Sequence, residues 1–455
     1  MTTRSAVQAS PRLVPLAATV LAGAIAALLE STITAMALDQ LRRDLAVPVT
    51  TVQWVTTAYV LAMAAVIPLV GWSVGRFGAR AVWLASLALF LLGSVLCGSA
   101  WSAASLIGFR VVQGLGGGMI LPLTQLTLAR AAGPARLGRV MSAVGLVGQI
   151  APISGPIVGG VLVDSWGWRW VFFVNVPIVL TSIVMAWRLF PPDDERSNRP
   201  LDLVGTVLVP LGVVAILHAL TGVGTGSGAA VVVTAALGVG LVTAFVVRSL
   251  RRRTPGLLDL RLFRDHSFRA GTVMMFALGA TTWGPMFLLP LYYQQLRGLP
   301  AFDSGLALAP QSLGLAVAFL AAGRYADRLP PRHLAIAGMS VATAATIPFA
   351  LAATSTDTVL LSLALFIRGV GYGVGSLPVS VALYRTLNPP DIPDATSLSN
   401  VVQRIGAASG TTLTAVILDT GGFTPALAWM LFLTGAATVV SAILPVRFAE
   451  QKTPS

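Results

Sequence analysis

The stretch Arg110-Val-Val-Gln-Gly-Leu-Gly-Gly-Gly118 decides the fold, because it places a charged side chain inside an apolar run that continues to Pro122. A charge inside a membrane costs about 2.5–3.5 kcal/mol on insertion scales, so Arg110 should face a bundle interior or water and have a partner. Arg368 repeats the pattern, and the glycine-rich helix that follows it ends at Pro378. The repetition predicts two related bundles.

The composition of the whole chain is that of a polytopic membrane protein. The 455 residues are 55% apolar and only 10% charged, against about 25% charged in a typical soluble protein, and the mean hydropathy is +0.82. A soluble chain with so few charges could not cover its own surface. The composition therefore excludes a soluble enzyme, a disordered protein and a disulfide-bonded secreted domain, and the single cysteine, Cys97, has no intrachain partner.

Apolar runs of spanning length recur along the chain, since a helix needs about 20 such residues to cross a bilayer. They predict an all-α polytopic fold with fourteen transmembrane helices, near residues 13–38, 51–70, 81–100, 104–128, 140–163, 170–190, 201–222, 229–248, 270–293, 304–322, 333–353, 358–383, 395–418 and 424–445. We expect a six-helix bundle in residues 1–190, two inserted helices with their linkers in 191–267, and a second six-helix bundle with a short tail in 268–455.

The net charge of +13 predicts an orientation rather than nucleic-acid binding, because the basic residues form no aromatic-interleaved patch. Most of the 30 basic residues fall in connections on one side of the membrane, and only Arg42, Arg43, Arg169 and Arg297 fall on the other. By the positive-inside rule this bias predicts cytoplasmic termini, with a cytoplasmic Arg248–Arg269 segment between them. We expect a multi-pass protein of the inner (plasma) membrane that binds no nucleic acid.

A second repeated segment supports a duplicated architecture. Gly71-Trp-Ser-Val-Gly-Arg76, between the second and third spans, matches Gly323-Arg-Tyr-Ala-Asp-Arg328, between the tenth and eleventh. Duplicated halves are typical of secondary transporters, in which the solute site lies at the interface of the repeats near the membrane midplane.

Four motifs resemble the major facilitator superfamily, specifically its fourteen-helix drug:proton antiporter branch. They are the first-helix motif Leu29–Leu38, the loop motif Gly71–Arg80, the fourth-helix motif Arg110–Gly118 and the fifth-helix antiporter motif Ala151–Gly160, and Trp168–Pro177 adds a segment common in the branch. The resemblance implies a major facilitator fold of two six-helix bundles plus two inserted helices, and efflux of drugs or antibiotics by proton antiport.

Glu30 is the predicted proton carrier, with Arg110 as the second coupling residue. All other acidic residues fall in connections or at span ends, and an embedded carboxylate marks an ion or substrate path by default. The resemblance supports the assignment, since Glu30 lies where the branch usually has Asp. We expect a proton on Glu30 to be exchanged for a cationic cargo. The alternative is a carboxylate that pairs with Arg110 only for packing.

Polar and aromatic residues inside the spans are predicted to line the substrate cavity. They are Thr34, Gln53, Trp54, Gln125, Gln149, Trp283, Gln311, Asn400 and Arg404, with Tyr59, Tyr292 and Tyr293 as further candidates. Trp and Tyr near span ends would otherwise belong to the interfacial belt. His218 lies in an inserted helix, so we expect it to be peripheral.

The residues predicted to govern conformational change belong to the loop and fifth-helix motifs. They are Gly71, Arg76, Gly78, Arg80, Gly155, Pro156, Gly159, Gly160, Asp327 and Arg328. The fifth-helix glycines allow helices to approach closely, for which ordinary packing is the alternative explanation. Gly75 stands where the family has an acidic residue that is thought to hold the cytoplasmic helix ends together. We therefore expect the cytoplasmic helix ends of the first half to be held together more weakly.

The predicted function is proton-coupled export of hydrophobic or cationic small molecules by a monomer. A dedicated exporter of one endogenous metabolite, antibiotic or lipid is the first alternative, and a proton symporter is the second. A non-transporting scaffold or receptor would leave Glu30 and Arg110 unexplained. The sequence contains no Walker A, HExxH or nucleophile-elbow motif. We therefore expect no enzyme activity, no metal and no cofactor, with the proton gradient as the energy source.

Overall fold

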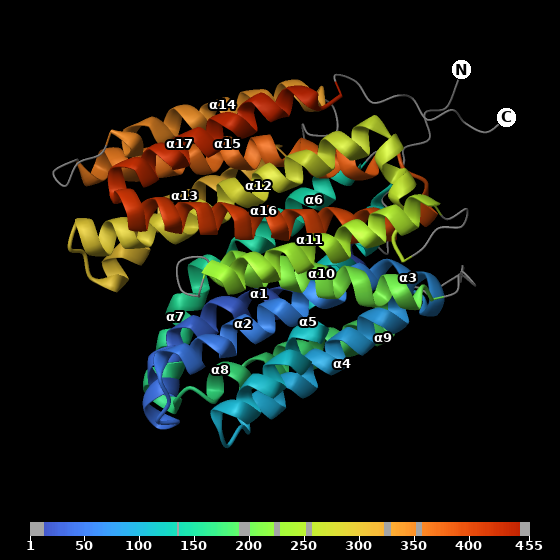
Figure 1. The fold of residues 1–455 in the computed structure, drawn as a ribbon, viewed down its shortest axis with the longest axis horizontal. Helices are drawn as coiled ribbons and strands as arrows, with labels where there is room; N and C mark the ends of the chain where they lie inside the picture. Colours follow the sequence, from blue (N-terminus) through green and yellow to red (C-terminus); the bar gives the residue numbers. More distant parts are fainter. Residues whose placement is uncertain are drawn as a thin grey trace.

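The computed structural model describes residues 13–133, 136–190, 201–222, 228–251, 257–322, 329–351 and 357–445, which form a nearly all-helical assembly (Figure 1). Within these ranges 13 helical segments are long and apolar enough to cross a membrane. A further span consists of two consecutive helices, α6 and α7, which only Gln149 separates. Neither of the two reaches spanning length alone, and with this broken span the structure accounts for the fourteen predicted crossings.

The helices fall into two sets with an inserted pair between them. The first half comprises α1 (Leu13–Asp44), α2 (Val49–Val66), α3 (Val70–Phe77), α4 (Ala79–Gly98), α5 (Ala103–Ala132), α6 (Leu137–Gly148), α7 (Ile150–Trp166), α8 (Trp170–Phe173) and α9 (Asn175–Leu189). The inserted pair is α10 (Leu203–Gly222) and α11 (Gly228–Arg251). The second half comprises α12 (His266–Leu291), α13 (Ala301–Ala322), α14 (Pro331–Ala350), α15 (Thr358–Tyr384), α16 (Ile392–Gly421) and α17 (Phe423–Val440).

Glycines set the closest helix contacts in both halves. A Cβ on Gly93 of α4 would lie 2.4 Å from the Cα of Gln113 on α5, so the two backbones touch. In the second half, a Cβ on Gly338 of α14 would lie 2.3 Å from the backbone nitrogen of Gly375 on α15. Small residues permit this approach between membrane helices. In each half, the glycine-rich helix that carries the buried arginine (α5 or α15) therefore packs closely against the preceding helix (α4 or α14).

The turn between α3 and α4 requires a glycine. Gly78 has a φ of +90°, a conformation that residues with a Cβ rarely adopt. The turn is followed by Arg80, whose Nη2 donates a hydrogen bond of 2.6 Å to the carbonyl oxygen of Trp187 at the end of α9. This contact ties the loop motif to the last helix of the first half.

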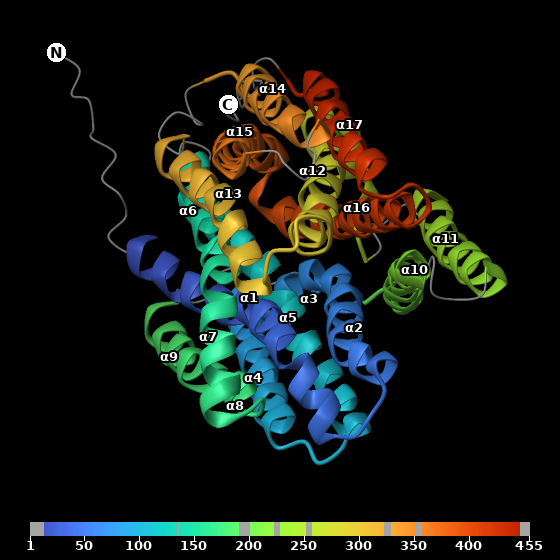
Figure 2. The same ribbon diagram turned by 90° about the vertical axis from the view of Figure 1, so that its left-hand side faces the viewer.

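The two halves meet near the end of the assembly at which α1 begins and α17 ends, which we call the terminal end. There the backbone N–H of Gly71 on α3 donates to Ser397 Oγ on α16 at 3.2 Å. A short distance further in, Asn400 Nδ2 donates to Gln125 Oε1 on α5 at 2.9 Å. In the view of Figure 2 most of the first half lies below the second half, and α6 reaches up beside α13.

The inserted pair lies at the side of the two halves (Figure 2). Helix α10 packs against α2 of the first half and α16 of the second. Helix α11 packs mainly against α10, and it leaves many apolar side chains exposed: Val232, Val233, Leu237, Val239, Val247 and Leu250. An ion pair of 2.8 Å between Asp202 and Arg248 joins the start of α10 to the end of α11. In a bilayer, the exposed face of α11 is the face that contacts lipid.

Candidate functional site

A buried ion pair lies in the interior of the first half. Arg110 Nη1 of α5 donates to the Glu30 carboxylate of α1, and both side chains are 0% exposed. The Nη1 atom also donates to Gln113 Oε1 at 2.7 Å, and Nε donates to the carbonyl oxygen of Val55 on α2 at 2.9 Å. The guanidinium stacks 4.1 Å from the centre of the Tyr59 ring. The site therefore unites the two residues predicted for proton coupling.

Two neighbours complete the surroundings of the Glu30 carboxylate. Thr34 Oγ1, one helical turn along α1, donates to Glu30 Oε1 at 2.9 Å. Asn175 Nδ2 of α9 donates to Glu30 Oε2. Thr34, which was predicted to line the cavity, binds the carboxylate directly. Asn175 was missed, although it lies in the quoted Trp168–Pro177 segment as a lone amide within an apolar run. A single amide within an apolar run was the sequence signal that could have identified Asn175 as a site residue.

The polar cluster extends from Glu30 to α4 as well. Gln113 Nε2 donates to Ser94 Oγ on α4 at 2.8 Å, and the Cys97 thiol lies 3.7 Å from Gln113 Oε1. Both α4 side chains are fully buried. Glu30, Arg110, Gln113 and Ser94 thus form a continuous chain of hydrogen bonds from α1 through α5 to α4.

The equivalent arginine of the second half has neutral partners. Arg368 is 2% exposed. Its Nη1 donates to Gln311 Oε1 of α13 at 2.7 Å, its Nε to Thr346 Oγ1 of α14 at 3.2 Å, and its Nη2 to the carbonyl oxygen of Thr281 on α12 at 3.1 Å. Among the described residues, no carboxylate lies within ion-pair distance of Arg368. Gln311, predicted to line the cavity, is therefore a ligand of this arginine.

Six of the remaining predicted cavity residues separate into two groups. Gln125 and Asn400 bind each other across the two halves, and Arg404 lies half-buried on the same helix as Asn400. Gln53, Trp54 and Trp283 are exposed. Trp54 packs against the ring of His218 on α10, with ring centres 5.8 Å apart, so His218 covers the first half from outside.

Gln149 and the predicted aromatic residues occupy other positions. Gln149 stands at the break between α6 and α7. Tyr59 stacks on Arg110, and so lies beside the ion pair. Tyr292 and Tyr293 are buried in an apolar cluster at the end of α12.

Three glycines of the conformational motifs, Gly71, Gly155 and Gly159, lie at close helix contacts. A Cβ on Gly155 would lie 2.1 Å from Thr32 Oγ1, and one on Gly159 would lie 3.0 Å from Met36 Cγ, so this face of α7 packs against α1 of its own half. A Cβ on Gly160 would meet nothing within 4 Å. Gly71 contacts α16, Arg76 is exposed, and Pro156 lies within α7. Asp327 and Arg328 fall outside the described residues.

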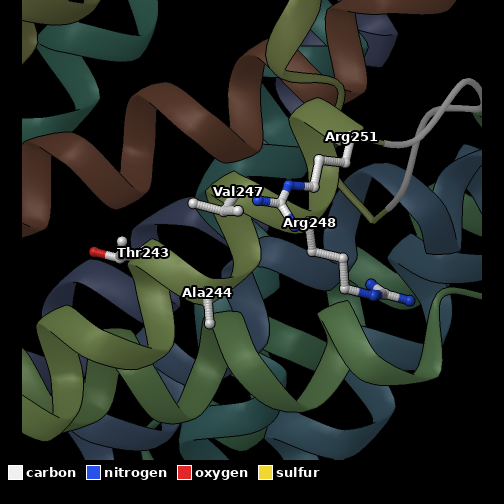
Figure 3. Close-up of a pocket in the computed structure, with 5 residues that line it drawn as sticks. All are labelled: Thr243, Ala244, Val247, Arg248 and Arg251. Atoms are coloured by element: carbon white, nitrogen blue, oxygen red, sulfur yellow. The ribbon is translucent and has the colours of Figure 1, made fainter.

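A hollow of about 540 Å³ lies on α11 (Figure 3). Its lining consists of Thr243, Ala244, Val247, Arg248 and Arg251. Within the described ranges no three His, Cys, Asp or Glu side chains are grouped closely enough to hold a metal ion. The chemistry of the interior therefore rests on the ion pair and the two further arginines, Arg368 and Arg404.

Repeated helical halves with ionisable side chains between them are the architecture of a membrane transporter. The chain belongs to the Major Facilitator Superfamily, whose family model matches residues 19–411. It is thus a multi-pass transporter of small molecules and not an enzyme.

Relatives and solved structures agree with this assignment. The chain is 38% identical over 372 residues to the multidrug resistance protein B homolog of Mycobacterium tuberculosis, covering 81% of this chain and 69% of that protein. It is 30% identical over 395 residues to the multidrug export protein EmrB of Haemophilus influenzae, covering 85% and 76%. The human organic anion transporter MFSD10 matches with a TM-score of 0.70 and 15% identity over 95% of this chain and 100% of that one, which is a likeness of fold.

Proposed function

We propose that the protein is a proton-coupled exporter of hydrophobic small molecules that works as a monomer by alternating access. The observation that carries the proposal is the Glu30–Arg110 pair, which is fully buried in the membrane-spanning interior. Glu30 lies 17 residues into α1, or about 25 Å from its start at 1.5 Å per residue. An ionisable group at this depth is expensive, and it is retained where protons or solutes pass. The names of the two relatives, multidrug resistance and multidrug export, support export as the direction.

Protonation of Glu30 would change the contact between α1 and α5. The carboxylate accepts from Arg110, Thr34 and Asn175, and so it joins three helices while it is charged. When Glu30 binds a proton it loses its attraction for Arg110, while the Val55 carbonyl and Gln113 still hold the guanidinium. The energetic consequence is large because a broken buried pair leaves a charge unpaired. Proton binding would thereby bias the arrangement of the first half.

The contacts at the terminal end suit the closed side of an alternating-access cycle. With the termini cytoplasmic, as the basic residues predict, the Gly71–Ser397 and Asn400–Gln125 bonds join the halves at the cytoplasmic face. A transporter that opens to this face must break these bonds. Movement of one repeat against the other about a central site is the usual way in which duplicated transporters expose the site in turn.

The experiment is Glu30→Gln in proteoliposomes with an imposed pH gradient. Gln removes the titratable proton at nearly constant shape and can still accept from Arg110. We expect normal insertion and thermal stability, loss of gradient-driven dye accumulation, and retained exchange of dye down its own gradient. Glu30→Asp should keep part of the coupling. Full gradient-driven transport in a well-folded Glu30→Gln protein would contradict the proposal.

The range of accepted compounds tests the breadth of the cargo. Accumulation of several unrelated dyes under the same gradient would support multidrug export. Transport of a single compound would support the dedicated exporter, and gradient-driven movement in the opposite direction would support a symporter.

A further inference from the structure

The charges buried in the membrane-spanning interior do not balance. Glu30 neutralises Arg110 in the first half. Arg368 in the second half donates to Gln311, Thr346 and a backbone carbonyl, which are all neutral. Arg404 is half-buried on α16, and the described residues offer it neither a hydrogen bond nor an ion pair. Two guanidinium groups of the second half therefore lie without a neighbouring carboxylate in that part of the chain.

The two arginines lie at nearly the same depth in the membrane. Arg368 donates to the carbonyl oxygen of Thr281 on α12. The carbonyl of Gln403, the residue before Arg404, lies 2.3 Å from the position of a Cβ on Gly279 of the same helix. Thr281 and Gly279 are two residues apart, which is about 3 Å along a helix axis. Both positive charges are thus placed beside one short stretch of α12.

Arg404 lies on the side of α16 that meets the first half. It is one helical turn beyond Asn400, whose side chain binds Gln125 of the first half, so the two residues share a face of α16. The Tyr59 hydroxyl and Arg110 Nη2 are both buried, and neither has a hydrogen-bond partner among the described residues. Two buried hydrogen-bond donors of the first half thus lack an acceptor, and Arg404 brings a positive charge to the face between the halves.

We propose that this site selects cargo carrying an anionic group, a carboxylate, sulfonate or phosphate, on an apolar body, and that Arg404 binds the anion. The inference rests on the proposed transport function and names its substrate class. A guanidinium matches the geometry of these anions with two parallel N–H groups, and the interaction gains strength where water is excluded. Arg368 adds a second positive charge at the same depth. Because Arg368 is buried, it raises the positive potential at the site without contacting the cargo.

The same arrangement disfavours cationic cargo. The expectation of a cation depended on a free carboxylate at Glu30, but that carboxylate already accepts from Arg110, Thr34 and Asn175. A cation between the halves would instead meet Arg404 and Arg368. Like charges repel strongly where the effective dielectric constant is low.

The test compares two dyes that share a xanthene ring, the sulfonated sulforhodamine B and the cationic rhodamine 6G. Binding to the purified full-length protein is measured by fluorescence anisotropy. We expect tighter binding of sulforhodamine B. Arg404→Gln should weaken that binding at least tenfold while leaving rhodamine 6G binding unchanged or tighter, and Arg404→Lys should retain part of it. Arg251→Gln, the same change of charge at the exposed end of α11, is the matched control and should affect neither dye.

Several outcomes would overturn the inference. They are preferential binding of rhodamine 6G, binding of neither dye, or an Arg404→Gln protein of normal thermal stability that binds sulforhodamine B as the wild type does. Gradient-driven transport is measured separately. Selective, Arg404-dependent binding without any dependence of transport on the pH gradient would refute proton coupling and leave the anion site standing. Proton-driven transport with a preference for the cation would refute the anion site and leave proton coupling standing.

Discussion

Gly71→Ala is expected to open the contact between the halves at the terminal end. A Cβ at this position would lie 2.6 Å from Asp394 Oδ1 and 3.2 Å from both the Asp394 nitrogen and the Pro393 carbonyl carbon on α16. The carboxylate can rotate away, but the backbone of α16 can only retreat. Overpacking of this kind costs about 1–3 kcal/mol. The cost falls only on the state in which α3 and α16 touch, so the ratio of closed to open molecules should fall by about 5- to 150-fold.

The assay measures distances between nitroxide labels by double electron–electron resonance. Labels at Phe77 on α3 and His333 on α14, both exposed, report on the separation of the halves in a Cys97→Ser background. The longer distance should gain population in Gly71→Ala. Gly108→Ala on α5 is the control, because its added Cβ meets nothing within 4 Å. An unchanged distance distribution in stable Gly71→Ala protein would refute the argument that this glycine sets the approach of the halves.

Three further changes test the interior and the loop motif. Gly93→Ala should lower the thermal stability strongly, since its Cβ would overlap the α5 backbone at Gln113; a melting temperature equal to that of Gly108→Ala would contradict the packing described. Asn175→Leu should destabilise the protein by about 1–3 kcal/mol through loss of a buried partner of Glu30, and unchanged denaturant unfolding would show that the amide is dispensable. Gly75→Asp, which restores the acid of the loop motif, should raise the closed population at the terminal end in the same distance measurement, and no change would mean that another contact already performs the role.

The architecture was predictable because it depends on composition and periodicity. The length of the apolar runs identified fourteen crossings, and the repeated arginines and glycines identified two halves. Even the fifth span, which is broken at Gln149, was found as one run, since a break in hydrogen bonding leaves the hydropathy unchanged. The pairing of Glu30 with Arg110 was also foreseeable, because two opposite charges buried in apolar helices have few other stable arrangements.

The contacts of individual polar residues were not predictable in the same way. Trp54 and Gln53 were predicted to line the cavity, but the sequence did not predict the contact of Trp54 with His218 on α10. The direction of a side chain depends on the rotation of the helix, which an almost uniformly apolar sequence does not reveal. Arg368 looked equivalent to Arg110 in sequence. Only the fold shows that its neighbours are neutral, since those neighbours come from α12, α13 and α14.

The break in the fifth span gives it two separate attachments. On the N-terminal side of Gln149, α6 packs against α13 and α15 of the opposite half as well as against α5 and α1 of its own half, and Gly145 fits against the ring of Phe319. Beyond it, α7 is fixed to α1 by the contact of Gly155 with Thr32. If the halves separate at the terminal end, α6 can follow its neighbours by bending at a single residue while α7 stays in place. The span would then link the two halves through a bend at Gln149 and limit how far they separate. The ion pair would keep its position while the halves move.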